Sequence, residues 1–240
     1  MLLFSGTSTN SIRCEFASFL SHATYLIYLN QIEPTTFRTW LRIIAKVPNA
    51  RLWLLRFPDL GEKNLREFAE KWAGPGVSKR MIFTDVAPKQ QHIARARVCD
   101  IFLDTPECNA HTTAADVTWS GTPLLTFPRH KYKMCSRIAA SIVRAAVPQT
   151  EDGKQIAEKL IAESEEDYEQ RAVSFASGLR YDTGGNGTAT GELMDIRRVL
   201  YEGRWTSSLF DTRRWVRDLE TAYELTWSRW VDGEGGDIWL

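Results

Sequence analysis

The sequence predicts an α/β fold: a Rossmann-like parallel sheet with flanking helices. Short apolar runs of strand length alternate with amphipathic stretches at helical spacing, a rhythm typical of parallel sheets. The alternation is clearest around residues 86–123, where we expect strands at Met81–Thr84 and Ile101–Leu103 and helices at Pro88–Val98 and His111–Trp119. Polar residues gather just after these strands, where open α/β sheets bind ligands.

Two further β–α units precede this stretch. Residues 1–24 lack clean periodicity, so we expect an irregular N-terminal segment. Strands are expected at Tyr25–Leu29 and Arg51–Phe57. Helices are expected from Pro34, which suits a first helical turn, to Val47, and over Asn64–Trp72. Residues 25–150 would then form one Rossmann-like core.

Residues 151–240 are expected to be mainly helical. After a strand at Leu124–Phe127, helical spacing indicates four helices, at Met134–Ala146, Asp152–Glu163, Glu166–Leu179 and Asp211–Val231. The Gly/Thr-rich insert at 181–191 predicts a flexible surface loop. The last helix carries an apolar stripe of Trp215, Leu219, Ala222, Tyr223 and Trp227. Such a stripe favours packing of the helix onto the sheet over ligand binding.

Composition excludes several classes of protein. The 240 residues include 30 basic and 30 acidic side chains, so nothing indicates bulk binding of nucleic acid or of acidic lipid. No apolar run is long enough for a transmembrane span, and no secretory signal is evident. The four cysteines lack CxxC spacing, which favours incidental thiols in a reducing compartment. The dinucleotide, P-loop, zinc-protease and nucleophile-elbow motifs are absent.

The first cluster of candidate site residues lies at the start of the helix expected at 111–119. His111, Thr112 and Thr113 fall at its start, where unpaired backbone N–H groups and the positive end of the helix dipole favour a phosphate. Asp116 lies one turn later on the same face and could accept hydrogen bonds from sugar hydroxyls. An ordinary Thr-capped helix with a buried Asp is an equally open interpretation.

The second cluster lies on the preceding helix. Lys89, His92 and Arg95 are spaced three apart, which places them on one helix face. This cationic face could meet diphosphate charge or a base ring. The alternative is a solvated basic face. Because both clusters follow neighbouring strands, together they favour a nucleotide diphosphate site more than either does alone.

Several motifs in these segments resemble a known family. They are Asn30-Gln31, Val47-Pro48-Asn49, Leu52–Pro58, Val86-Ala87-Pro88-Lys89 with His92, Leu103–Pro106 with Cys108-Asn109, His111-Thr112-Thr113 with Asp116, and Gly121-Thr122-Pro123. The chain from about Leu29 to Val231 resembles the C-terminal catalytic lobe of the protein O-linked N-acetylglucosamine transferase family.

The resemblance implies a GT-B fold, of which this chain would be the C-terminal lobe. It also implies transfer of N-acetylglucosamine (GlcNAc) from UDP-GlcNAc to Ser and Thr of nuclear and cytoplasmic proteins. That transfer would invert the anomeric centre and need no metal. UDP-GlcNAc would be the donor substrate, and no cofactor is implied. Carried over by motif, Ala87, His92 and Arg95 would contact the uracil, and Lys89 and Asp116 the ribose. Gln31, His111, Thr112 and Thr113 would contact the diphosphate.

The chain also departs from the family pattern. A lysine that follows the Asn-Gln motif in the family and neutralises the leaving diphosphate is missing from Asn30–Pro34. The family's N-terminal lobe with its catalytic histidine, and its tetratricopeptide repeats, lie outside this chain and are expected partners in a complete enzyme. The alternative is a truncated or degenerate, non-catalytic UDP-binding or interaction module. Similar plant sequences use fucose donors, so the sugar is also an open expectation.

Overall fold

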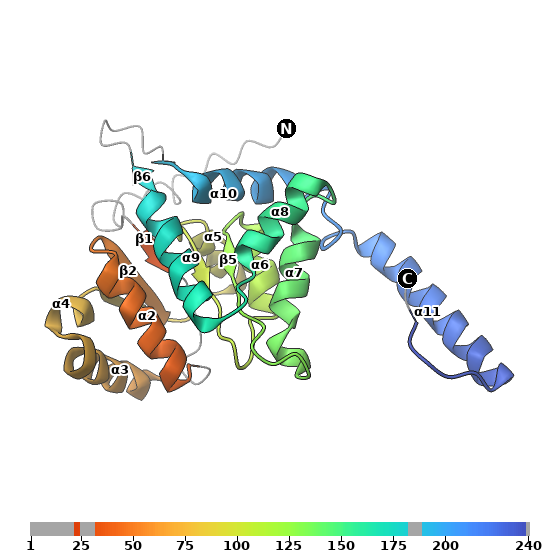
Figure 1. Ribbon diagram of the computed structural model, residues 1–240, viewed down its shortest axis with the longest axis horizontal. Coiled ribbons are helices and arrows are strands. Elements are labelled where there is room, and N and C mark those ends of the chain that lie inside the picture. The colour runs from red at the N-terminus through yellow and green to blue at the C-terminus, as the bar shows by residue number, and fades with distance from the viewer. Residues whose placement is uncertain (1–21, 25–31, 182–188, 239–240) are drawn as a thin grey trace.

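Short parallel strands lie at the centre of the protein, with helices around them (Figure 1). The computed structural model describes residues 22–24, 32–181 and 189–238. One parallel sheet has the order β1-β2-β3, and β4 pairs in parallel with β5. The strands are β1 (His22–Thr24), β2 (Ala50–Leu55), β3 (Met81–Thr84), β4 (Phe102–Leu103) and β5 (Leu124–Leu125).

Helices connect and cover these strands, except the last helix, which extends away from the body (Figure 1). They are α2 (Pro34–Lys46), α3 (Asp59–Ala73), α4 (Pro75–Ser78), α5 (Lys89–Ala96), α6 (Thr112–Trp119), α7 (Ile138–Ala146), α8 (Glu151–Leu160), α9 (Glu165–Gly178), α10 (Glu192–Gly203) and α11 (Thr212–Asp232). A 3-10 turn, η2 (Met134–Ser136), precedes α7. Among these described helices, none is both long enough and apolar enough to cross a membrane.

The core forms between the strands and the inner faces of the helices. Strand β2 buries all of Leu52–Leu55, as expected for a parallel strand covered on both faces. Helix α2 buries Trp40, whose indole Nε1 donates to the Tyr168 hydroxyl of α9 at 3.2 Å. That hydrogen bond satisfies a polar group that burial would otherwise penalise. Helices α2 and α9 lie side by side in Figure 1, and this contact fixes them together.

Most of the predicted elements are confirmed, with shifted ends. The expected strand Met81–Thr84 matches β3, and the strands expected at Ile101–Leu103 and Leu124–Phe127 are shorter as β4 and β5. The helix expected at Met134–Ala146 is divided at Arg137 (φ −119°, ψ −15°) into the 3-10 turn η2 and the α-helix α7. The sequence analysis missed α4 and α10.

Two segments are expected to be irregular, and the structure corrects the first of these expectations. His22–Thr24, inside the segment expected to be irregular, forms β1, whereas the predicted strand Tyr25–Leu29 lies outside the described residues. The flexible loop predicted at 181–191 lies mostly outside the described residues, and only its two ends are described. Its edges, β6 (Arg180–Tyr181) and β7 (Ala189–Thr190), pair antiparallel, so backbone hydrogen bonds fix both ends.

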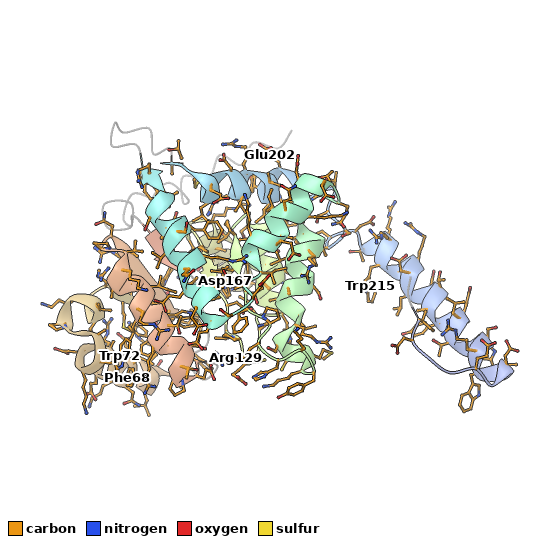
Figure 2. The ribbon with its side chains drawn as sticks, in the orientation of Figure 1. Phe68, Trp72, Arg129, Asp167, Glu202 and Trp215 are labelled. Carbon is orange, nitrogen blue, oxygen red and sulfur yellow. The ribbon has the colours of Figure 1, made fainter. Side chains whose placement is uncertain are left out.

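The expectation that the last helix packs onto the sheet is wrong. Among the described residues, α11 buries no side chain, and Figure 1 shows it extending away from the body. Trp215, labelled in Figure 2, is 61% exposed. The aromatic contacts to the body come from the connector before α11, where Trp205 and Phe210 pack edge-on against Trp119 of α6. The chain leaves the body after them.

The start of α8 depends on a glycine. Thr150 caps the helix by accepting from the N–H of Gly153, and a Cβ at Gly153 would lie only 1.9 Å from the carbonyl oxygen of Pro148. A backbone atom cannot rotate away as a side chain does. We therefore expect Gly153→Ala to lower the free energy of unfolding by at least about 2 kcal/mol, measured by denaturant unfolding.

Gly178→Ala, at the end of α9, is the matched control, because a Cβ there meets nothing within 4 Å. It should be neutral or stabilising by up to about 1 kcal/mol. Equal stability of the two variants would contradict this account of the α8 start.

Candidate functional site

The loop between β4 and α6 is held by buried polar groups. Asp104, at the end of β4, accepts from the backbone N–H of Ala110 at 2.7 Å and from the Thr126 hydroxyl at 2.7 Å. The Asn109 side chain donates to the carbonyl of Thr105 at 2.9 Å. Because these bonds lie inside the loop and at its ends, they fix the direction in which α6 begins.

The start of α6 is open to a ligand. His111 is the N-cap residue, and its side chain makes no capping hydrogen bond. His111 and Thr112 are exposed, and Thr113 is half-buried. The first-turn N–H groups have no partner within the helix, and the helix dipole adds positive potential there, so the turn suits an anion.

These positions argue against the alternative of an ordinary Thr-capped helix with a buried Asp. Thr112 and Thr113 lie inside the first turn rather than at the cap. Asp116 is half-buried, not buried. Its side chain is therefore partly accessible, and its spacing from Thr112 places it on the same helix face.

Helix α5 braces the loop that precedes it. Arg95 donates through Nη1 to the carbonyl of Asp85 at 2.9 Å, and the Asp85 carboxylate pairs with Arg56 at 2.7 Å. These contacts hold residues 85–88, which include the half-buried Ala87. Lys89 is exposed at the first position of α5. A solvated basic face accounts for Lys89, but not for the half-buried His92 and Arg95.

The two clusters come together because α5 and α6 pack against each other. Ser120 donates to the carbonyl of Ile93 at 2.8 Å, and Thr122 donates to the carbonyl of Ala96 at 2.6 Å. Burial lowers the pKa of His92, the Asp116 carboxylate opposes that shift, and Arg95 adds to it. His92 and Asp116 thus lie within electrostatic reach of each other, and the neutral imidazole is favoured at neutral pH.

A charged cluster that was not predicted from the sequence includes a residue of the β4–α6 loop, Glu107. The Arg129 guanidinium pairs with Glu33, with Glu107 at 3.1 Å and with Glu165 at 3.4 Å. In Figure 2, Arg129 lies beside the lower ends of α2 and α9. It joins the N-cap of α2, the β4–α6 loop and the first residue of α9. The sequence does show basic residues at 129–133, but nothing local indicates their acidic partners.

Glu107 is the most strongly stabilised carboxylate of this cluster. Hydrogen bonds from His130, Lys133 and Arg129 outweigh partial burial and lower its pKa to about 2. Glu33 is also lowered in pKa, because hydrogen bonds from Thr35, Arg129 and Thr36 outweigh its burial. Gln31, the remaining predicted site residue, lies outside the described residues.

The comparisons with known proteins agree on one family. The model described as glycosyl transferase family 41 matches residues 23–219. A probable UDP-N-acetylglucosamine–peptide N-acetylglucosaminyltransferase, SEC, of Arabidopsis thaliana is 39% identical over 86% of this chain. A UDP-N-acetylglucosamine–peptide N-acetylglucosaminyltransferase of Caenorhabditis elegans is 35% identical over 85% of the chain. This chain spans only 19% and 16% of those two relatives.

A solved structure supports the fold. A mutant O-GlcNAc transferase of Thermobaculum terrenum superposes with a TM-score of 0.69 at 23% identity, covering 86% of this chain and 36% of that one. At that identity, the likeness supports the GT-B assignment of the lobe and leaves the chemistry to the residues of the site.

The buried Asp104 carboxyl should give the stability of the chain a characteristic pH dependence. Burial raises the pKa of Asp104 from 3.8 to about 7, against the hydrogen bonds from Thr126, Ala110 and Thr105. The unfolded chain loses this proton near pH 4, and the folded chain keeps it until about pH 7. Asp104 therefore contributes less stability as pH rises through this window, and its contribution is constant outside it.

Asp104→Asn removes this titration, so we expect the variant to gain stability relative to the wild type between pH 4 and pH 7, by a few kcal/mol at most. Denaturant unfolding across that pH range measures the difference. Parallel profiles for Asp104→Asn and the wild type would contradict the role of the buried carboxyl.

Proposed function

The chain belongs to glycosyl transferase family 41, and we propose that it forms the donor-binding lobe of a protein O-GlcNAc transferase. The donor would be UDP-GlcNAc, and the acceptors would be Ser and Thr hydroxyls of proteins. The observation that carries this proposal is the packing of α5 against α6, which brings His92 and Asp116 within electrostatic reach of each other.

The proposed donor contacts follow the family motifs. The uracil would lie against the backbone of Ala87 and beside His92 and Arg95. The ribose hydroxyls would meet Lys89 and Asp116. The diphosphate would occupy the α6 start, at His111, Thr112 and Thr113, with Gln31 approaching from the first loop. The support for this arrangement is that these residues of α5 and α6 are exposed or half-buried and that the two helices pack against each other.

The chemistry proposed for this lobe is stabilisation of the leaving group. As the glycosidic bond breaks, negative charge grows on the UDP diphosphate, and the α6 N–H groups with both threonine hydroxyls are suited to receive it. The transfer would invert the anomeric centre without a metal. The base that activates the acceptor hydroxyl is proposed to come from an N-terminal lobe that lies outside this chain, as are tetratricopeptide repeats. The expected location is the cytoplasm and nucleus.

One observation favours a second candidate, a non-catalytic UDP-binding or interaction module. The loop that in the family carries a lysine for the leaving diphosphate has Glu33 here, already paired with Arg129. Loss of that charge would cost transition-state stabilisation. A sugar-transfer assay with a separately supplied family N-terminal lobe separates the two functions, because only the enzyme lobe restores transfer.

Calorimetric titration of UDP tests the donor site directly. We expect the wild-type chain to bind UDP, and Thr113→Ala and Asp116→Ala each to weaken binding by about tenfold, because each loses a hydrogen bond to the ligand. Asp218→Ala on α11 is the control, since its carboxylate only approaches Arg214, at 3.4 Å, on an exposed surface. It should bind as the wild type does.

Two results would contradict the proposal. A folded wild-type chain that gives no heat at millimolar UDP has no donor site of its own. Unchanged binding in both Thr113→Ala and Asp116→Ala would place the nucleotide elsewhere.

A further inference from the structure

Two cysteines lie side by side next to the proposed donor site. Cys108 is in the β4–α6 loop, three residues before His111, and Cys135 is in η2 after β5. The N–H of Asn109 donates to the carbonyl of Cys135 at 2.7 Å. The Cys135 thiol lies 3.6 Å from the carbonyl oxygen of Glu107. These contacts flank Cys108 on both sides, so the two segments run together at this residue.

The thiols themselves are close and partly accessible. Cys108 and Cys135 are within hydrogen-bonding reach of each other, and both are half-buried. Cys99, the remaining described cysteine, is fully buried, so its thiol is not accessible to an oxidant. Disulfides need Cβ atoms about 3.5–4.5 Å apart, so two contacting thiols on adjacent backbone segments need only a small adjustment to form one.

The polar bonds of the loop would couple that adjustment to the α6 start. Asn109, directly after Cys108, accepts through its side chain from the Ala139 N–H at 3.3 Å, and Ala110 donates to the buried Asp104. The loop is therefore short and fixed at its far end. A shift of Cys108 toward Cys135 has to be absorbed within the few residues that lead to His111 and Thr112.

We propose that Cys108 and Cys135 are a reversible oxidation site, whose disulfide ties the β4–α6 loop to η2 and weakens nucleotide binding at the start of α6. The effect on binding rests on the proposed function, whereas the disulfide itself does not. Cytosolic disulfides of this kind are typically transient and regulatory.

The oxidant class is a small-molecule disulfide such as oxidised glutathione. One cysteine thiolate attacks the glutathione disulfide and releases one glutathione thiolate, leaving a mixed disulfide on the protein. The second cysteine thiolate then attacks the protein-bound sulfur and releases the other glutathione. Both cysteines are oxidised by one electron each, one glutathione disulfide is reduced to two thiols, and the two thiol protons end on the released glutathione.

The test uses the whole chain in mixtures of oxidised and reduced glutathione. After alkylation of the remaining thiols, peptide mass mapping should find a Cys108–Cys135 crosslink that dithiothreitol reverses. Cys99→Ala should still form it, and Cys108→Ser and Cys135→Ser should not. UDP titration should then give a dissociation constant about tenfold higher for the oxidised chain than for the reduced chain, with both serine variants insensitive to glutathione.

The outcomes separate the two proposals. Absence of the crosslink under excess oxidised glutathione, or pairing with another cysteine, would overturn the oxidation site. A crosslink with unchanged UDP affinity would overturn its control of binding. A crosslink in a chain that binds no UDP even when reduced would overturn the proposed function and its redox control together, while the oxidation site would stand.

Discussion

The buried Asp104 is the point from which the candidate site is positioned. Its carboxylate accepts from Ala110 in the β4–α6 loop and from Thr126 after β5, and its carbonyl accepts from the Tyr168 hydroxyl of α9 at 3.1 Å. Tyr168 in turn accepts from Trp40 of α2. A chain of four hydrogen bonds thus links the loop that opens α6 to the core. Because Asp104, Thr126, Tyr168 and Trp40 are buried, breaking one of these bonds leaves an unsatisfied partner, and the loop geometry is correspondingly fixed.

Two kinds of electrostatic interaction occur around the candidate site: ion pairs in the Arg129 cluster, and dipoles at the start of α6. Arg129 is already paired with three carboxylates, so its positive charge is largely neutralised and would attract a diphosphate only weakly. The proposed diphosphate site at the start of α6 depends instead on backbone N–H groups, threonine hydroxyls and the helix dipole. These act as fixed dipoles that need no reorganisation when charge develops. The missing family lysine makes this dependence on the α6 start stronger.

The features that could be predicted from the sequence are those that depend on neighbouring residues in the chain. Strand β2 could be recognised because burial of Leu52–Leu55 on both faces gives a continuous apolar run. Thr112 and Thr113 could be placed because first-turn positions follow from where a helix begins, and Asp116 because it lies one turn later on the same face. The role of Arg129 could not be predicted, because its partners are residues 33, 107 and 165. Contacts between residues so far apart leave no pattern in the local sequence. The exposed placement of α11 was missed because an apolar stripe does not say which surface, if any, will cover it.

The central claim is that one nucleotide diphosphate site spans the β3–α5 and β4–α6 loops. Hydrogen exchange of backbone amides with and without saturating UDP tests it most directly, since bound diphosphate should slow exchange of the first-turn amides of α6. We predict protection in peptides that cover residues 86–95 and 108–116, and none in α10 at 192–203. Protection confined to other segments, or an unchanged exchange pattern at saturating UDP, would contradict the account.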